Sequence, residues 1–220
     1  MTSVATLLQS KIYAPINVSL FSAFFDCTFI DFSRLSLDGT LTISGKGDMP
    51  DFVRAPWYNE REKITNVVIK DGVTSIGSKA FLDCDFLASV TIPDSVTTIG
   101  DWAFNRCIGL TSVTIPDSVT SIGSYAFGNC SGLKSVTIGS GVTSVGSGAF
   151  CDCGNIELLL CKASVPPRLA EDALRGIPEN TIIVIPQDYE DFYAFSDWMK
   201  YADKKESPKK HISSCDNHPF

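Results

Sequence analysis

The sequence predicts a repeat solenoid of the α/β class, in which short parallel strands and turns stack as successive coils. Residue types recur every 23 positions between about residues 67 and 161, and a fixed period of this length is the signature of a repeat array. Each unit also alternates apolar and polar residues over the length of a strand. Of the 220 residues, 44% are hydrophobic and 20% charged, a composition that excludes intrinsic disorder and supports a buried core.

The repeat is marked by columns of identical residues spaced 23 apart. One unit alone buries too little apolar surface to offset the loss of backbone entropy, so the units must stack on one another. Apolar columns then run continuously through the stack and form its core. The phenylalanine and cysteine columns are Phe81, Phe104, Phe127, Phe150 and Cys84, Cys107, Cys130, Cys153.

Each unit begins with a segment that has the pattern of a strand. In residues 110–115, Val113 and Ile115 alternate with Thr114, which is the period of a strand with one buried face. Pro116 follows and has no amide hydrogen with which to extend a ladder. The strand is therefore expected to end in a turn at that point.

The rest of the unit contains a second extended piece and a compact turn. Residues 119–122 are short and extended, and Gly123 closes them at a backbone corner. In residues 124–130, a serine opens a segment whose Ala, Phe and Cys spacing indicates about one helical turn. We expect this helical turn in every coil.

The flanks are expected to cap the array, because the end coils would otherwise expose apolar columns and strand edges. An Asp38-Gly39 turn between alternating segments predicts an N-terminal hairpin. Residues 183–186 and the aromatic stretch that follows predict a terminal strand and helix. The expected units are an extension at 1–34, a hairpin cap at 35–66, repeats at 67–161, a last repeat and cap at 162–202, and a flexible tail at 203–220.

The core of residues 110–115 resembles the leucine-rich repeat signature, and residues 116–130 make it similar to the BspA-type leucine-rich repeat in particular. Ser95, Ser118 and Gly141 stand where the generic repeat has Asn or Cys, which agrees with the BspA type. The resemblance implies a right-handed leucine-rich-repeat solenoid with parallel strands, short helical turns, an N-terminal hairpin cap and a C-terminal strand–helix cap. It also implies an adhesin-like protein that is extracellular or at a cell surface.

The eight cysteines admit disulfides, metal binding or simple packing. Coils in a parallel ladder lie about 4.8 Å apart, which a disulfide could span at about 4.4–6.8 Å between Cα atoms. Stacked side chains point in parallel, however, and a bridge needs the sulfur atoms to converge. We expect reduced thiols that pack as small hydrophobic groups.

Three groups of residues have some features of a metal site. We expect no metal and no cofactor, because the first two groups lack a complete ligand set and the third fits backbone capping in turns better than calcium binding. The groups are Cys151, Cys153 and Cys161; His211, Cys215 and His218; and the acidic row Asp71, Asp94 and Asp117.

The sequence contains no catalytic motif. Its only histidines, His211 and His218, lie in the last ten residues, so the folded body has no histidine base. We therefore expect no enzymatic activity; the alternative is an enzyme that uses Asp, Glu or Cys alone. A net charge of −7 disfavours nucleic acid and anionic lipid as partners.

The candidate binding residues are the hydroxyl side chains that project from the predicted strands opposite the buried ones. They form a flat strip that ends at Val68 and Leu160. We expect this strip to bind a protein or a glycan; the alternatives are ice binding by regularly spaced threonines, and a purely structural role, since threonine suits exposed strand positions. The strip consists of Ser89, Thr91, Ser112, Thr114, Ser135 and Thr137, and a second column of Thr74, Thr97, Thr120 and Thr143 lies on the other extended piece.

The N-terminal residues do not have the pattern of a clean signal peptide. The first ten residues carry no Lys or Arg, and Asp26 interrupts the apolar stretch from Ile16 to Ile30. That stretch is also too short to span a bilayer. We therefore expect no membrane span, while the sequence leaves the oligomeric state open.

Overall fold

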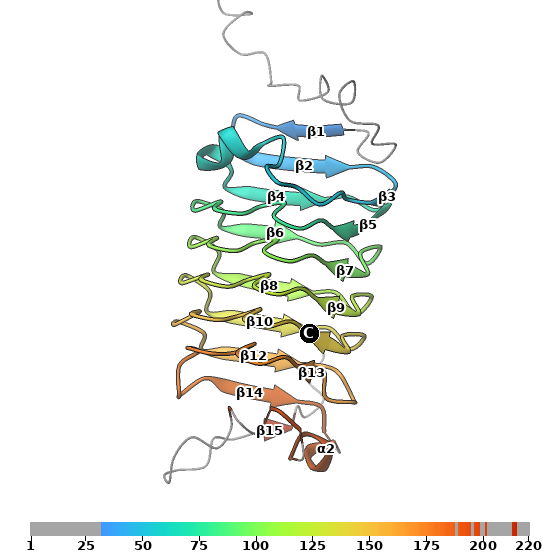
Figure 1. The fold of residues 1–220 in the computed structure, drawn as a ribbon, viewed down its shortest axis with the longest axis vertical. Helices are drawn as coiled ribbons and strands as arrows, with labels where there is room; N and C mark the ends of the chain where they lie inside the picture. The colour runs from blue at the N-terminus through green and yellow to red at the C-terminus, as the bar shows by residue number, and fades with distance from the viewer. Residues whose placement is uncertain (1–31, 188, 195, 199–200, 202–212, 215–220) are drawn as a thin grey trace, which may run out of the picture.

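The computed structural model describes residues 32–187, 189–194, 196–198, 201 and 213–214. They form a stack of coils along one long axis, with short strands in two layers (Figure 1). The parallel-strand solenoid predicted from the repeat is confirmed. The segment 1–31, most of the expected tail, and His211, Cys215 and His218 lie outside the described residues.

The first layer holds the longer strand of each coil. It consists of two sheets, of order β1-β2-β4-β6 and β15-β14-β12-β10-β8, and β6 is not paired with β8. All pairings in this layer are parallel except that of β1 with β2. The strands are β1 (Phe32–Leu35), β2 (Thr40–Ser44), β4 (Asn66–Ile69), β6 (Ser89–Thr91), β8 (Ser112–Ile115), β10 (Ser135–Ile138), β12 (Leu158–Cys161), β14 (Ile182–Ile185) and β15 (Ser213–Ser214).

The second layer is one six-stranded parallel sheet of order β13-β11-β9-β7-β5-β3. Five of its six strands are only two residues long, and a glycine corner follows four of the six, at Gly77, Gly100, Gly123 and Gly146. The strands are β3 (Gly47–Asp48), β5 (Val73–Ile76), β7 (Thr98–Ile99), β9 (Ser121–Ile122), β11 (Ser144–Val145) and β13 (Arg168–Leu169).

The register of the strands follows from the 23-residue spacing. Ser112 lies opposite Ser135 and Val113 opposite Val136 in the β8–β10 pair, so like residues stack on like. Within β8 the burial alternates between exposed and buried positions, as the two-residue period predicts. Equal spacing therefore places each column on the same side of its strands along the stack.

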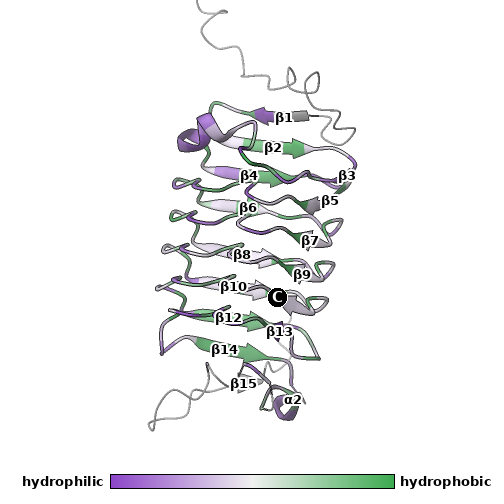
Figure 2. Cartoon of the chain, viewed as in Figure 1, coloured by the Kyte–Doolittle hydropathy of each residue, from purple (hydrophilic) through white to green (hydrophobic). Residues whose placement is uncertain are grey.

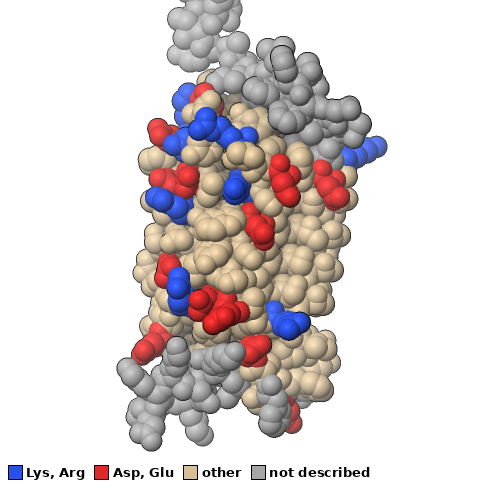
Figure 3. All heavy atoms as spheres, in the orientation of Figure 1, with Lys and Arg blue, Asp and Glu red and all other residues tan. Residues whose placement is uncertain are grey.

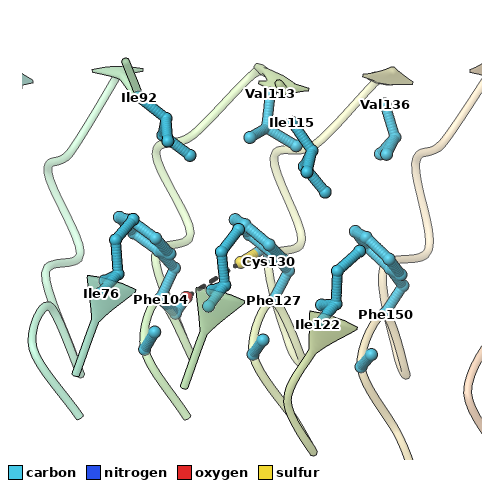
Figure 4. Close-up of a cluster of buried hydrophobic side chains, with 14 of the residues drawn as sticks. Ile76, Ile92, Phe104, Val113, Ile115, Ile122, Phe127, Cys130, Val136 and Phe150 are labelled. Atoms are coloured by element: carbon cyan, nitrogen blue, oxygen red, sulfur yellow. Dashed lines mark hydrogen bonds between the residues drawn. The ribbon is translucent and has the colours of Figure 1, made fainter. Parts of the chain in front are cut away.

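The core between the layers contains a continuous aromatic stack (Figure 4). The rings of Phe104 and Phe127 lie 5.1 Å apart with an interplanar angle of 5°, and those of Phe127 and Phe150 lie 5.3 Å apart at 4°. The stack extends beyond the repeated phenylalanines, because Trp57 lies over Phe81 at 5.5 Å and 22°. The Trp57 indole also donates a hydrogen bond to the carbonyl oxygen of Ala80, at 2.7 Å.

The cysteine column lies beside the aromatic stack, and its thiols are buried. The thiols of Cys107, Cys130 and Cys153 each donate to the phenylalanine carbonyl of the preceding coil, at 3.3, 3.2 and 3.1 Å. These sulfur atoms are free, as are those of all six described cysteines. The column therefore links successive coils through S–H···O contacts rather than through disulfides.

The turn that follows each second-layer strand differs from the helical turn expected over residues 124–130. No helix is present there, and Tyr125 and Asn129 have φ values of 55° and 59°. The same two positions are left-handed in the neighbouring coils, for example at Trp102 and Arg106 with φ of 60° and 61°. This backbone does not form the i to i−4 hydrogen bonds of an α-helix. Alternate amides, such as that of Phe127, donate to the next coil, and those between them, such as that of Gly128, donate to the residue three positions earlier.

Peptide hydrogen bonds between coils run in opposite directions in the turns and in the second layer. In the turn, the N–H of Phe104 donates forward to Ala126 at 2.7 Å. At the corner that ends the second-layer strand, the N–H of Gly123 donates backward to Ile99 at 2.8 Å. Inter-coil pairing therefore satisfies the backbone that a helix would have satisfied internally.

The two ends of the array are closed by different devices. At the N-terminal end, β1 pairs antiparallel with β2, and its first residue, Phe32, lies in the segment expected as an extension. The 3-10 helix η2 (Tyr58–Lys63) replaces the turn of the first coil. At the C-terminal end, α2 (Glu190–Ala194) brings Tyr193 to the Ala163 carbonyl at 2.8 Å. These contacts cover apolar columns that would otherwise be exposed.

Candidate binding face

The predicted strip lies on the outer face of the first layer. Ser89, Thr91, Ser112 and Thr114 are exposed, and Ser135 is half-buried, as is Thr137 in the same row. Among the strip residues, only Ser89 has a side-chain hydrogen bond to another described residue, which runs to Asn66 at 2.7 Å. Most of these hydroxyls therefore remain available to a ligand.

The same face continues over β12 and β14 with aliphatic side chains in place of hydroxyls. In the register of this pair, Leu158 lies opposite Ile182 and Leu160 opposite Val184. Leu158 and Ile182 are 39% and 53% exposed. Figure 2 shows β12 and β14 as more hydrophobic than β6, β8 and β10. We call Leu158, Leu160, Ile182 and Val184 the aliphatic end of the face.

Sequence reasoning included Leu160 but missed the other three residues of the aliphatic end. The run from Leu158 to Leu160 has no polar residue to show which side chains face outward. The alternation of polar and apolar residues that identified the strip is therefore absent there. The available signal was the 23-residue step from Ser135 to Leu158.

No outward position of the face carries a charge, although 20% of the chain is charged. Figure 3 shows a different side of the molecule. On that side the charged side chains lie mainly toward the two ends, and the area over the middle coils is largely uncharged. A partner of the face thus meets no fixed charge on its outward positions. These positions, from β4 to β14, are Asn66, Val68, Ser89, Thr91, Ser112, Thr114, Ser135, Thr137, Leu158, Leu160, Ile182 and Val184.

The second threonine column belongs to the other layer. The hydroxyls of Thr97 and Thr120 donate to the carbonyl oxygens of Thr74 and Thr97, at 3.0 and 3.1 Å, and Thr143 does the same to Thr120 at 3.0 Å. These hydroxyls link coils and lie near the second-layer strands, away from the strip. The two columns therefore do not form one plane. The ice-binding alternative would favour a single flat surface made of both columns.

Serine replaces asparagine in the ladder at the turn after the first-layer strand. Ser118 donates to the Val96 carbonyl at 2.7 Å, and Ser95 donates to the Val73 carbonyl at 2.8 Å. At Gly141 a Cβ atom would lie 2.1 Å from the Asp117 carbonyl oxygen, so no side chain fits there. The departure from the generic repeat is thus a shorter hydroxyl ladder.

The acidic row is exposed, and one of its members caps a backbone amide. Asp117 accepts a hydrogen bond from the Ser140 amide of the next coil at 2.8 Å, whereas Asp71 and Asp94 cap no amide of the described residues. Within the described ranges, no three His, Cys, Asp or Glu side chains gather as metal ligands would. The structure thus does not bring Cys151, Cys153 and Cys161 together as a ligand set.

Several of the thiols are in environments that oppose ionisation. Burial raises the pKa of Cys84 to about 12, and it also raises the pKa of Cys107 and of Cys161. Cys161 makes a 3.1 Å contact with the Tyr193 hydroxyl. Because the thiolate is the reactive form of cysteine, these side chains suit packing rather than nucleophilic chemistry.

No helix in the described part of the chain is long and apolar enough to cross a membrane. The C-terminal end does have a small cavity of about 230 Å³, lined by residues that include Asp172, Arg175 and Glu179. It holds none of the predicted binding residues.

Comparison with known proteins identifies the repeat and the fold. Residues 54–167 match the family described as "BspA type Leucine rich repeat region", in six copies. A leucine-rich repeat protein from Eubacterium ventriosum is similar, with 26% identity, a TM-score of 0.53, and coverage of 79% of this chain and 56% of that one. None of the curated proteins matches the chain in sequence.

Two further solved structures are similar. A leucine-rich cell surface protein from Faecalibacterium prausnitzii shares 30% identity, with a TM-score of 0.51 and coverage of 84% of this chain and 54% of that one. The leucine-rich repeat protein of T. pallidum shares 20% identity, with a TM-score of 0.55 and coverage of 86% and 97%, and shows the fold alone. The chain therefore spans little more than half the length of the E. ventriosum and F. prausnitzii proteins.

Proposed function

Since the chain belongs to the BspA-type leucine-rich repeat family, we propose that it is a non-enzymatic, adhesin-like module that binds a protein partner at a cell surface. The observation that carries this proposal is the uncharged outer face of the first layer, with exposed hydroxyls that end in an aliphatic patch. Solenoids of this kind use extended surfaces to bind macromolecules.

The chemistry of the face favours a protein over a charged polymer or a glycan. An uncharged surface costs little to desolvate against apolar and amide groups, whereas an anionic polymer gains nothing from it. The face has no aromatic side chain on which a sugar ring could stack. The aliphatic end, with Leu158 and Ile182, is the part that can anchor a partner by burial.

The proposed location at a cell surface is supported by one of the similar proteins. The F. prausnitzii protein, which is 30% identical, is described as a cell surface protein. The proposal extends that location to this chain. The buried thiols are compatible with it, because they need no reducing compartment to remain free.

The experiment is a binding measurement of the purified chain against a panel of purified extracellular matrix proteins and a glycan array. We expect saturable binding to at least one protein, weakened at least tenfold by Thr114→Lys or Leu160→Lys on the face. Thr97→Lys is the matched control, because Thr97 is also exposed but lies in the other layer. Binding to no protein, or equal losses from Thr114→Lys and Thr97→Lys, would refute the proposal.

A further inference from the structure

The first layer is interrupted between two coils whose sequences are nearly identical. β6 and β8 belong to different sheets and are not paired, and they lie visibly farther apart than the other neighbours in that layer (Figure 1). Beneath β6, Ile92 is 9% exposed and Val90 is only partly buried, whereas the corresponding Val113 is 3% exposed. The interruption therefore opens the core slightly toward solvent. We call it the β6–β8 seam.

The seam is confined to the first layer. On the other side of the core, β7 and β9 remain paired, with Thr98 opposite Ser121. The rings of Phe81 and Phe104, which belong to the same two coils, remain stacked at 5.0 Å. The two coils are thus paired in the second layer and stacked in the core, and only their first-layer strands are unpaired.

Two large apolar side chains are exposed just before the unpaired strands. Phe86 is 60% exposed and precedes β6, and Ile108 is 46% exposed and precedes β8. The two segments are in contact, because a Cβ atom at Gly109 would lie 2.8 Å from the Asp85 carbonyl oxygen. Phe86 and Ile108 are therefore carried by adjoining backbone segments of the two coils, and we call the two exposed side chains the apolar patch.

The patch is specific to these two coils. One coil further on, the positions that match Ile108 and Gly109 are Ser131 and Gly132, and in the next coil they are Gly154 and Asn155. No column of the core requires Phe86 or Ile108, since both point into solvent. Exposed apolar groups mark interaction sites when they are contiguous rather than scattered singly.

The charges around the patch restrict its partner. Asp83 is paired with Arg106 at 3.4 Å, so these two charges offset one another. Asp85, next to Phe86, forms no ion pair with any residue that the structure describes. An uncompensated carboxylate beside an apolar group favours a cationic neighbour and opposes anionic lipid.

We propose that Phe86, Ile108 and the β6–β8 seam form a docking site for a protein segment that carries an apolar side chain next to a Lys or Arg. The apolar side chain packs on Phe86 and Ile108, and the cation lies opposite Asp85. The unpaired strands lend the site adaptability, because no ladder hydrogen bond between β6 and β8 must break when the partner binds. The seam lies between two strands of the proposed binding face, but Asp85, Phe86 and Ile108 precede those strands, so the two proposals are tested by changes at different residues.

The test is a selection from a random 12-residue peptide display library against the purified full-length chain, followed by affinity measurements on synthetic peptides. The expected consensus has an apolar residue adjacent to Lys or Arg. Phe86→Ser and Ile108→Ser are each expected to weaken the selected peptides at least tenfold. Asp85→Asn is expected to weaken them severalfold and to reduce the dependence of binding on salt.

Val165→Ser is the matched control, since Val165 is 70% exposed but lies on a loop far from the seam. It should leave peptide affinity unchanged, and equal thermal midpoints would show that all variants fold. Failure to enrich any peptide, an acidic consensus, or binding that survives Phe86→Ser would overturn the proposal. The proposal would also be overturned if the chain bound phosphatidylcholine–phosphatidylserine vesicles through Phe86, or if sedimentation velocity showed that it forms a dimer that Phe86→Ser abolishes.

Discussion

Truncation of one ring in the middle of the aromatic stack tests whether the stack stabilises the solenoid. Phe127 is fully buried and stacks on Phe104 and Phe150 at 5.1 and 5.3 Å. Phe127→Ala should lower the free energy of unfolding by about 4–5 kcal/mol, the upper part of the range for buried phenylalanine, because both ring faces lose a partner. Phe127→Leu keeps most of the apolar volume but removes two aromatic pairs, for about 1–3 kcal/mol.

The assay is urea unfolding followed by far-ultraviolet circular dichroism, with thermal unfolding as a second measurement. For a chain of this size, the loss in Phe127→Ala corresponds to a fall in Tm of about 8–20 °C. Phe86→Ala is the matched control and should change stability by less than about 0.5 kcal/mol, because Phe86 is 60% exposed. A Phe127→Leu variant as stable as the original chain would show that ring stacking contributes nothing beyond apolar burial.

Two further predictions concern the columns beside the stack. Burial raises the folded-state pKa of Cys84 to about 12. The stability that this neutral thiol contributes is therefore complete below its unfolded pKa of about 8.5 and is lost as the pH rises toward 12. Cys84→Ala should lessen the alkaline loss of stability in urea titrations between pH 8 and 11, and an unchanged profile would count against the prediction. Ser118→Ala removes the donor to the Val96 carbonyl and should cost about 1–2 kcal/mol, whereas Ser112→Ala on the exposed face should cost almost nothing; equal denaturation midpoints for the two variants would contradict the ladder.

The sequence was sufficient for the columns and the two layers, because these depend on spacing alone. Phe104 and Phe127 are 23 residues apart, and any regular stack brings such residues together. Trp57 was harder to assign to the stack, since it lies 24 residues before Phe81. The same one-residue offset separates Phe150 from Leu174, so both ends of the stack depart from the period in the same way.

The turns could not be predicted from local preference. Ala, Phe and Cys at residues 126–130 have the spacing of a helical turn, and non-glycine residues such as Tyr125 ordinarily avoid positive φ. The observed left-handed conformation is stabilised by hydrogen bonds to the next coil, such as that from Asn129 to Cys151 at 2.7 Å. A pattern read within one coil contains no information on bonds that the following coil supplies.

The candidate site was predictable only in part, for two different physical reasons. Thr91 and Thr114 could be placed on the outer face because they alternate with buried residues, whereas Leu158 could not, because Leu159 and Leu160, which follow it, are also apolar. The β6–β8 seam has no signal at all, since the strands that begin at Ser89 and Ser112 share the sequence Ser-Val-Thr-Ile. The difference between these coils lies before the strands, at Phe86 and Ile108.

The opposed directions of the inter-coil hydrogen bonds have an electrostatic consequence. Aligned peptide groups in an α-helix sum to a macrodipole with partial charges at its two ends. In this solenoid the forward bond from Phe104 to Ala126 and the backward bond from Gly123 to Ile99 have peptide dipoles that point in opposite directions along the stack. These contributions oppose one another along the axis, so a longer stack does not accumulate charge at its ends in the way that a longer α-helix would.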